Sequence, residues 1–219
     1  MIPAHCPAWF GLAGCRSRRA TAYAVGLILG VLLAAGSSLA AGSRDEWQQP
    51  DRVVTDLNLK SGARVADVGC GNGYFTFRLA KAVGESGKVF ATDIDAKALK
   101  SVSQRAEKEH LGNIEAVLSE PTKTKLKAGS VEAALLSDVL HHVPAAQRLP
   151  LVHSIVQALK PGGVLFVLDW RKSHEVKQDP YDRLIPLEDL VKLGKDAGLT
   201  LDAEFHYLKF QVFVRFRKP

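Results

Sequence analysis

The sequence predicts an α/β fold, with a mostly parallel sheet, helices on both faces and a C-terminal antiparallel hairpin. Two observations predict it. From Ser43 onward, short apolar runs alternate repeatedly with amphipathic helical stretches, and this alternation is typical of parallel strands joined by right-handed helical crossovers. At the end of the chain, two apolar strands follow each other with only two residues between them, which predicts the hairpin.

Each element is predicted from its local pattern. The predicted parallel strand Val164–Leu168 is apolar throughout, as a strand covered on both faces must be. The helices carry apolar residues at helical spacing and end at glycines such as Gly84 and Gly198. Asp95 suits the N-cap of one helix, and Pro150 suits the first turn of another. The other predicted strands are Arg64–Val68, Lys88–Thr92, Ile114–Leu118, Val131–Leu136, Thr200–Tyr207 and Phe210–Phe216, and the predicted helices after a lead-in segment Arg44–Asn58 are Tyr74–Val83, Ala96–His110, Pro150–Leu159 and Leu187–Ala197.

The composition is that of one globular domain. The chain has 219 residues, of which 47% are hydrophobic and 24% are charged, and this excludes wholesale disorder and a multi-span membrane protein. The formal net charge is +6, but Arg16, Arg18 and Arg19 contribute three of these charges. We expect no nucleic-acid partner, because the basic residues are not interleaved with aromatic ones. The histidines lack the spacing of metal ligands, so we expect no metal.

Residues 1–40 have the layout of a targeting segment, and residues 41–219 form the predicted domain. Arginines precede an uncharged run with an apolar centre, and small residues stand before Ala41, as in a cleaved secretory signal peptide. The run is also just long enough for a retained membrane anchor. Either case places the domain outside the cytoplasm, exported or associated with the membrane through this segment. A mis-assigned start of the chain is the third reading and would leave the domain in the cytoplasm.

Two features at strand ends predict a binding site for an adenosine-bearing ligand. Gly69, Gly71 and Gly73 follow the first strand, and a bare backbone lets N–H groups approach an anionic ligand closely. Asp93 ends the second strand, where a carboxylate can accept both hydroxyl groups of a ribose. The third glycine comes one position too early for the dinucleotide fingerprint G-x-G-x-x-G. A nicotinamide-dependent oxidoreductase is therefore the less favoured alternative.

Four segments resemble the motifs of the class I S-adenosylmethionine-dependent methyltransferases. They are Val65–Gly73, Thr92–Asp95, Ser137–Val143 and Leu159–Gly163, and the resemblance extends over about residues 47–219. Each motif is weak alone, but the four occur in the order of the family. The resemblance implies a Rossmann-like sheet whose last strand is inserted antiparallel, with a turn before the fifth strand. It also implies S-adenosyl-L-methionine as the methyl donor and S-adenosylhomocysteine as the product.

The resemblance implies a subsite for the methionine part of this cosubstrate. Gly69, Gly71 and Gly73 would face the methionine part, and Asp67 would help to hold its ammonium group. Asp138, at the end of the fourth strand, would line the methyl-donor site.

The resemblance places the nucleoside and a candidate base on other strand ends. Asp93 would hold the ribose, Ile94 would pack on the adenine, and Glu120 would lie near the adenine amino group. A sulfonium is already an electrophile, so the protein needs no nucleophile, but a general base helps when the acceptor is a hydroxyl or an acidic carbon. His141 and His142 follow the fourth strand and titrate in a suitable range. They are the candidate catalytic residues.

The acceptor is expected to be a small molecule. No Asp/Asn-Pro-Pro-aromatic tetrapeptide follows the fourth strand, which argues against methylation of nucleic-acid bases. Position alone assigns the acceptor site to the loop Arg171–Ile185, with Trp47 and Tyr74 as apolar walls. A non-catalytic module that binds S-adenosylmethionine without turnover is the second alternative.

Overall fold

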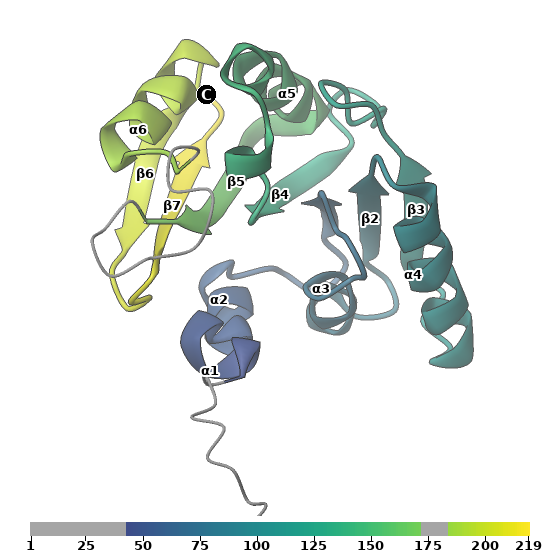
Figure 1. Cartoon of the computed structure of the whole chain (residues 1–219). Coiled ribbons are helices and arrows are strands. Elements are labelled where there is room, and N and C mark those ends of the chain that lie inside the picture. Colours follow the sequence, from purple (N-terminus) through teal and green to yellow (C-terminus); the bar gives the residue numbers. More distant parts are fainter. Residues whose placement is uncertain (1–42, 172–183) are drawn as a thin grey trace, which may run out of the picture. The chain divides into compact units, whose positions relative to one another are not determined.

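The computed structural model describes residues 43–171 and 184–219 of the chain (Figure 1). Its strands form a seven-stranded sheet in the order β3-β2-β1-β4-β5-β7-β6. The strands are β1 (Arg64–Val68), β2 (Lys88–Asp93), β3 (Ile114–Leu118), β4 (Val131–Ser137), β5 (Leu159–Trp170), β6 (Thr200–Phe205) and β7 (Gln211–Arg217). The helices are α1 (Arg44–Gln48), α2 (Pro50–Asp56), α3 (Thr76–Val83), α4 (Ala96–Lys108), the 3₁₀ helix η1 (Leu140–His142), α5 (Ala145–Ala158) and α6 (Leu187–Asp196).

The strand order creates a ligand edge. β1 pairs in parallel with both β2 and β4, so the chain moves outward through β2 and β3 and then returns to the other side of β1. Ligands of open α/β sheets bind at such a switch point, beyond the carboxyl ends of the strands. β7 is antiparallel to both β5 and β6, which confirms the predicted hairpin and the inserted last strand.

Helices cover both faces of the sheet, as the sequence predicts (Figure 1). Leu151 and Ile155 of α5 pack with Leu190 of α6 in one buried cluster, while Val53 of α2 and Leu79 of α3 belong to another. The strands between them alternate their side chains between the two clusters, because successive residues of a strand point to opposite faces. This packing holds the strand ends in fixed positions for the site.

Most predicted boundaries agree with the structure, but the start of α5 does not. The Asp95 side chain accepts a hydrogen bond from Lys97 N at 2.8 Å and caps α4, as predicted. The prediction that Pro150 occupies a first turn is wrong, because α5 begins at Ala145 and contains Pro150 in its interior. Pro144 already directs the chain into the helix with φ −53° and ψ 141°. Pro150 has no N–H to donate to the carbonyl of Ala146, so α5 lacks that hydrogen bond.

Two connections also differ from the prediction. Residues 160–163 do not form a turn before the fifth strand but a bulge inside β5, since Val131 pairs with Leu159 and Ala133 with Val164. Residues 206–210, rather than two residues, connect β6 to β7. Leu208 in this connection is buried in the core, so its apolar side chain anchors a loop instead of extending a strand.

Candidate functional site

The glycine loop is folded tightly against the neighbouring strand and turn. Gly69 N and Cys70 N both donate to Thr92 O, at 2.8 and 3.0 Å, which holds the loop beside the end of β2. Gly69 has φ +71°, and a Cβ there would lie 2.4 Å from Val139 Cγ2. A side chain at this position is therefore excluded by the turn that follows β4.

Gly71 is open where Gly69 is crowded. Its φ is +52°, and a Cβ built on it meets no heavy atom within 4 Å. Its N–H donates to Asp93 Oδ2 at 2.8 Å. Gly73 completes the loop, with Phe77 packed 2.5 Å from the position of a Cβ. The loop thus presents bare backbone to free space at Gly71, as a close ligand contact requires.

Asp93 links the glycine loop to the end of β2. Besides the bond from Gly71 N, its Oδ1 accepts from Asp95 N at 2.9 Å. Each carboxylate oxygen has a second lone pair, so Asp93 can still accept two hydroxyl groups. Its role in holding a ribose stays a prediction, and the geometry is suitable for it.

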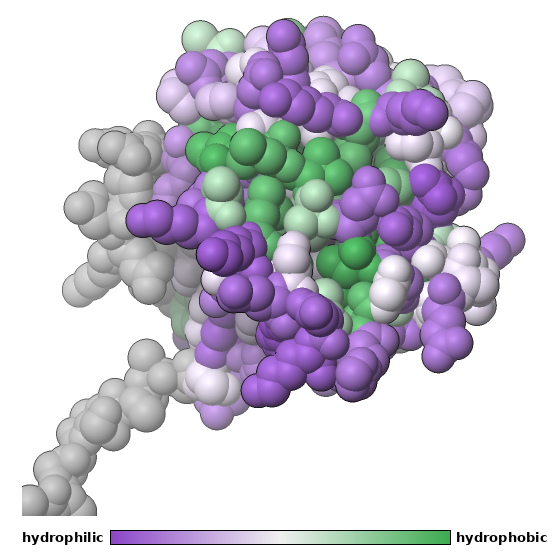
Figure 2. Space-filling model, turned by 90° about the vertical axis from the view of Figure 1, so that its right-hand side faces the viewer, coloured by the Kyte–Doolittle hydropathy of each residue, from purple (hydrophilic) through white to green (hydrophobic). Residues whose placement is uncertain are grey.

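A cavity of about 430 Å³ lies beside Asp93. The predicted nucleoside residues Ile94 and Glu120 line it, and Ile94 is 62% exposed, so its side chain is open for contact. Glu120 pairs with Lys125 at 3.0 Å, and the hydrogen bond from that lysine lowers the pKa of Glu120. Figure 2 shows hydrophobic surface gathered in hollows between hydrophilic rims on one face of the molecule.

Asp67 is a buried carboxyl group near the glycine loop. It is 3% exposed, and Thr76 Oγ1 donates to its Oδ2 at 2.6 Å. Burial raises the pKa of Asp67 to about 6, although the hydrogen bond from Thr76 opposes the shift. A cationic ligand beside it would stabilise the carboxylate form.

A second, smaller cavity of about 140 Å³ contains this carboxyl group. Asp67, Gly71, Arg44 and Tyr74 are among the residues that line it. Gly69 and Asp138 line both cavities. The two spaces therefore adjoin at these two residues.

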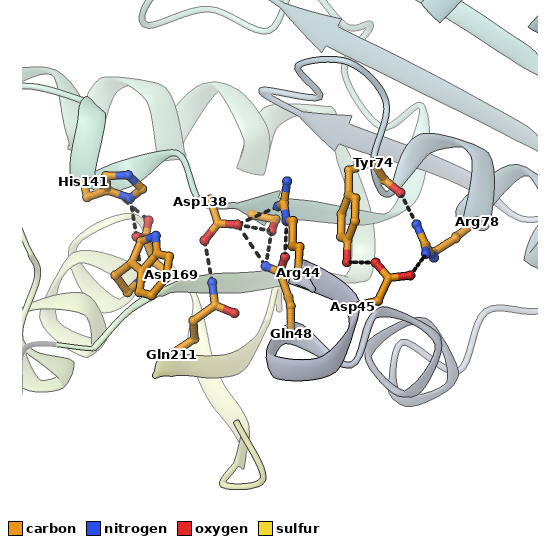
Figure 3. Close-up of polar contacts among 11 residues, drawn as sticks. Arg44, Asp45, Gln48, Tyr74, Arg78, Asp138, His141, Asp169 and Gln211 are labelled. Carbon is orange, nitrogen blue, oxygen red and sulfur yellow. Dashed lines mark hydrogen bonds and ion pairs between the residues drawn. The ribbon is translucent and has the colours of Figure 1, made fainter. Parts of the chain in front are cut away.

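Asp138 is the centre of a polar network at the end of β4 (Figure 3). It has φ +57°, a left-handed conformation that aspartate tolerates better than most residues. Its Oδ2 accepts from Arg44 Nη2 at 2.8 Å and from Gln48 Nε2 at 2.9 Å, and its Oδ1 accepts from Gln211 Nε2. Burial is the main cause that raises the pKa of Asp138, while the bond from Gln48 opposes it.

The network includes residues that sequence reasoning missed. Arg44 and Gln48 belong to α1, which the sequence indicated only as an amphipathic lead-in, and Gln211 begins β7. Asp45 of α1 accepts from the Tyr74 hydroxyl at 2.6 Å. Arg44 and Asp138 are 94 positions apart in the sequence, so no local spacing could signal their contact.

The two adjacent histidines have different environments. His141 is 6% exposed, and its Nδ1 lies 2.6 Å from Asp169 Oδ1 at the end of β5. His142 is exposed and lines the larger cavity. The two rings are 3.9 Å apart. Of the two predicted bases, His142 therefore faces open space, while His141 is held by Asp169, a partner that sequence reasoning did not identify.

Trp47 and Tyr74, the predicted apolar walls of the acceptor site, are only partly exposed. Trp47 packs against Trp170 with ring centroids 5.0 Å apart, and both are half-buried. The Arg44 guanidinium covers the Tyr74 ring at 3.8 Å. Most of the predicted acceptor loop, residues 172–183, lies outside the described residues.

Three other features bear on the chemistry. Cys70 is buried, and burial raises the pKa of its thiol, which argues against a reactive thiolate. Within residues 43–171 and 184–219, no group of three or more His, Cys, Asp or Glu side chains could hold a metal ion. In the same part of the chain, no helix has the length and apolar character needed to cross a membrane.

Comparisons with known proteins agree with this geometry. Residues 65–163 match the family model for a methyltransferase domain. A demethylmenaquinone methyltransferase of Staphylococcus saprophyticus is 29% identical over 123 residues, which are 56% of this chain and 50% of that protein. The ubiquinone/menaquinone biosynthesis C-methyltransferase UbiE of Pseudomonas paraeruginosa is 30% identical over 178 residues, covering 78% of this chain and 65% of that protein.

A solved structure supports the same conclusion over more of the chain. A SAM-dependent methyltransferase from Aquifex aeolicus aligns with a TM-score of 0.75 and 27% identity, covering 83% of this chain and 95% of that one. The chain spans about half the length of the demethylmenaquinone methyltransferases it matches. These findings leave no support for the oxidoreductase alternative. The sheet order, the glycine loop and these relatives together show that the chain belongs to the class I S-adenosylmethionine-dependent methyltransferases.

Proposed function

We propose that this chain transfers the methyl group of S-adenosylmethionine to a small aromatic acceptor of the reduced-quinone class. The observation that carries the proposal is the pair of cavities that adjoin at Gly69 and Asp138. The smaller one is lined by the carboxyl groups of buried Asp67 and half-buried Asp138, which suit an ammonium group. The larger one is lined by Asp93 and Ile94, which suit a nucleoside. The sulfonium of the ligand would then lie between them, beside Asp138.

The chain's own residues would bind, orient and accept a proton. S-adenosylmethionine, when bound, supplies an electrophilic methyl group, so the protein must align the acceptor and exclude water. Asp67 and Asp138 would hold the amino-acid end, and Asp93 would hold the ribose. His142, exposed on the cavity wall, would accept the proton that the acceptor releases. Asp169 would orient His141, which packs against His142.

The reduced-quinone acceptor is inferred from the relatives and from the aromatic residues. The matched relatives are named for demethylmenaquinone and for ubiquinone/menaquinone biosynthesis. Trp47 and Trp170 form a half-buried pair, and Gln48, next to Trp47, reaches Asp138. Aromatic faces stack favourably on a planar ring. A hydroquinone ring carries hydroxyl groups whose deprotonation makes the neighbouring ring carbon nucleophilic, which suits a general base at His142.

A labelled-methyl assay tests this function. The full chain is incubated with methyl-labelled S-adenosylmethionine and a chemically reduced demethylmenaquinone with a short side chain, and the product is analysed by mass spectrometry. We expect a labelled C-methyl product from the reduced quinone and none from the oxidised form. Binding of S-adenosylhomocysteine without methyl transfer to any acceptor of a broad panel would instead support the non-catalytic binding module.

We further propose that residues 1–40 direct export or anchor the domain 41–219 at a membrane. The support is the arginine cluster followed by an uncharged apolar run. A location at the membrane would suit a lipophilic acceptor. Cell fractionation combined with the mass of the mature N-terminus tests the proposal. A soluble cytoplasmic chain that still begins at Met1 would contradict it.

A further inference from the structure

We propose that an apolar groove along α6 and β6 binds the hydrocarbon side chain that a quinol acceptor carries on its ring. The inference rests on the proposed function and adds a subsite for the part of the acceptor that takes no part in the chemistry. None of the described residues that line this groove lines either cavity assigned to the cosubstrate. The groove is therefore a separate feature of the molecule.

Two adjoining cavities form the groove. One has a volume of about 500 Å³ and is lined by Val212 of β7. The other has a volume of about 570 Å³ and is lined by Val191 of α6 and Leu201 of β6. Leu187 and Glu188, at the start of α6, line both cavities. The groove therefore follows α6, which lies beside β6 and β7 in Figure 1.

The floor of the groove is apolar. Leu187 and Leu201 are half-buried, and both pack against the buried cluster that contains Val212. Val191 is also half-buried. Each of these half-buried side chains leaves part of its apolar surface in contact with water, and covering such surface with a hydrocarbon chain is favourable.

The charges around the groove cancel. Lys192 pairs with Asp196 at 2.5 Å. Balanced charge selects neither an anion nor a cation, and the stems of long charged side chains can themselves cover an apolar ligand. A neutral hydrocarbon chain is the occupant that this lining suits. Among the described lining residues, three basic and three acidic side chains occur: Arg171, Lys192, Lys195, Glu188, Asp196 and Glu204.

The groove begins beside the candidate base. Val212 pairs with Asp169 in the antiparallel ladder of β5 and β7, and directly opposed side chains lie on the same face of a sheet. Asp169 Oδ1 lies 2.6 Å from His141 Nδ1, and the rings of His141 and His142 are 3.9 Å apart. An acceptor ring held next to His142 can therefore extend its side chain over Val212 towards α6.

The test compares two reduced naphthoquinones as acceptors for the full chain at saturating S-adenosylmethionine. One acceptor carries a side chain of two isoprene units, and the other carries hydrogen in its place. Leu187→Gln puts a polar amide where the two cavities adjoin, and Val191→Trp fills the groove. The control is Leu193→Gln, because Leu193 is a half-buried leucine of α6 that packs against the same cluster but is not among the described residues that line the groove.

We expect the wild type to methylate the quinol with the side chain at least about tenfold more efficiently, as kcat/KM, and mainly through a lower KM. Burial of about two methylene groups already corresponds to about a tenfold change in affinity, and binding remote from the reacting atoms acts equally on ground and transition states. Leu187→Gln and Val191→Trp should each lower this kcat/KM about five- to tenfold. Both should leave the quinol without a side chain unaffected, and Leu193→Gln should change neither acceptor.

Two results would overturn the groove assignment while leaving the proposed function intact. One is equal kcat/KM of the wild type for the two quinols, and the other is a side-chain preference that Leu187→Gln and Val191→Trp both preserve. Absence of methylated product from either quinol is a different outcome, because it would refute the proposed function and the groove assignment together. Melting curves establish that each variant is folded. Should Leu187→Gln fail to fold, Val191→Trp decides by the same criteria.

Discussion

Substitution of Asp93 by alanine tests the core of the proposed site, because this carboxylate serves both the loop and the predicted ribose. In the wild type it accepts from Gly71 N at 2.8 Å and from Asp95 N at 2.9 Å. Asp93→Ala leaves both N–H groups without this acceptor and also removes the partner of the ribose hydroxyls. We therefore expect a loss of both stability and cosubstrate affinity.

The magnitude follows from the number and exposure of these bonds. A hydrogen bond to a charged group contributes ~1.5–3 kcal/mol when it is shielded, but Asp93 is half-buried, so water can replace part of each lost bond. We expect S-adenosylhomocysteine binding to weaken by ~1–3 kcal/mol, which is roughly 5–150-fold. The unfolding free energy of the ligand-free protein should fall by a similar ~1–3 kcal/mol.

Calorimetric titration and urea unfolding measure the two effects separately. Asp95→Ala is the matched control, because Asp95 caps α4 through Lys97 N at 2.8 Å but does not line either cavity. It should lower the unfolding free energy by ~0.5–2 kcal/mol and leave the affinity unchanged. Unchanged affinity in folded Asp93→Ala would refute the ribose assignment.

Three further predictions concern the loop, the buried carboxyl group and the base. Gly69→Ala should destabilise the chain and abolish S-adenosylhomocysteine binding in thermal-shift assays, because the added Cβ would lie 2.4 Å from Val139 Cγ2 at φ +71°; normal ligand binding would contradict this. Burial raises the pKa of Asp67 from 3.8 to about 6, so the folded state binds this proton more tightly than the unfolded state, and the associated stability is lost as pH rises through that window. Asp67→Asn should therefore gain stability relative to wild type as pH rises from 3.8 to about 6, up to ~3 kcal/mol in urea unfolding, whereas a gain independent of pH would be inconsistent with the raised pKa. His142→Ala should lower kcat by about 10²–10⁴-fold with the reduced quinone at saturating S-adenosylmethionine; His153→Ala on α5 is the control, and equal activity of the two variants would exclude His142 as the base.

The elements that sequence reasoning predicted well are those with strong local signals. β1, β2 and β3 are short apolar runs, Asp95 caps α4 as predicted, and the glycine loop lies where β1 ends. The strand ends converge on one edge because parallel strands share their direction, so the placement of Gly71 beside Asp93 followed from topology. Pro150 misled the prediction of α5, since a proline that suits a first turn can also stand inside a helix when another proline, Pro144, precedes it.

The sequence by itself determined the α/β class, the methyltransferase family and the strand ends that carry the predicted cosubstrate residues, because propensity, periodicity and turn chemistry act over a few neighbouring positions. Only the tertiary structure decided which side chains meet across the site. It brought Arg44 to Asp138 and Glu120 to Lys125, and it buried the side chain of His141 while leaving that of His142 exposed. Such contacts depend on how distant segments pack, and no local pattern encodes them.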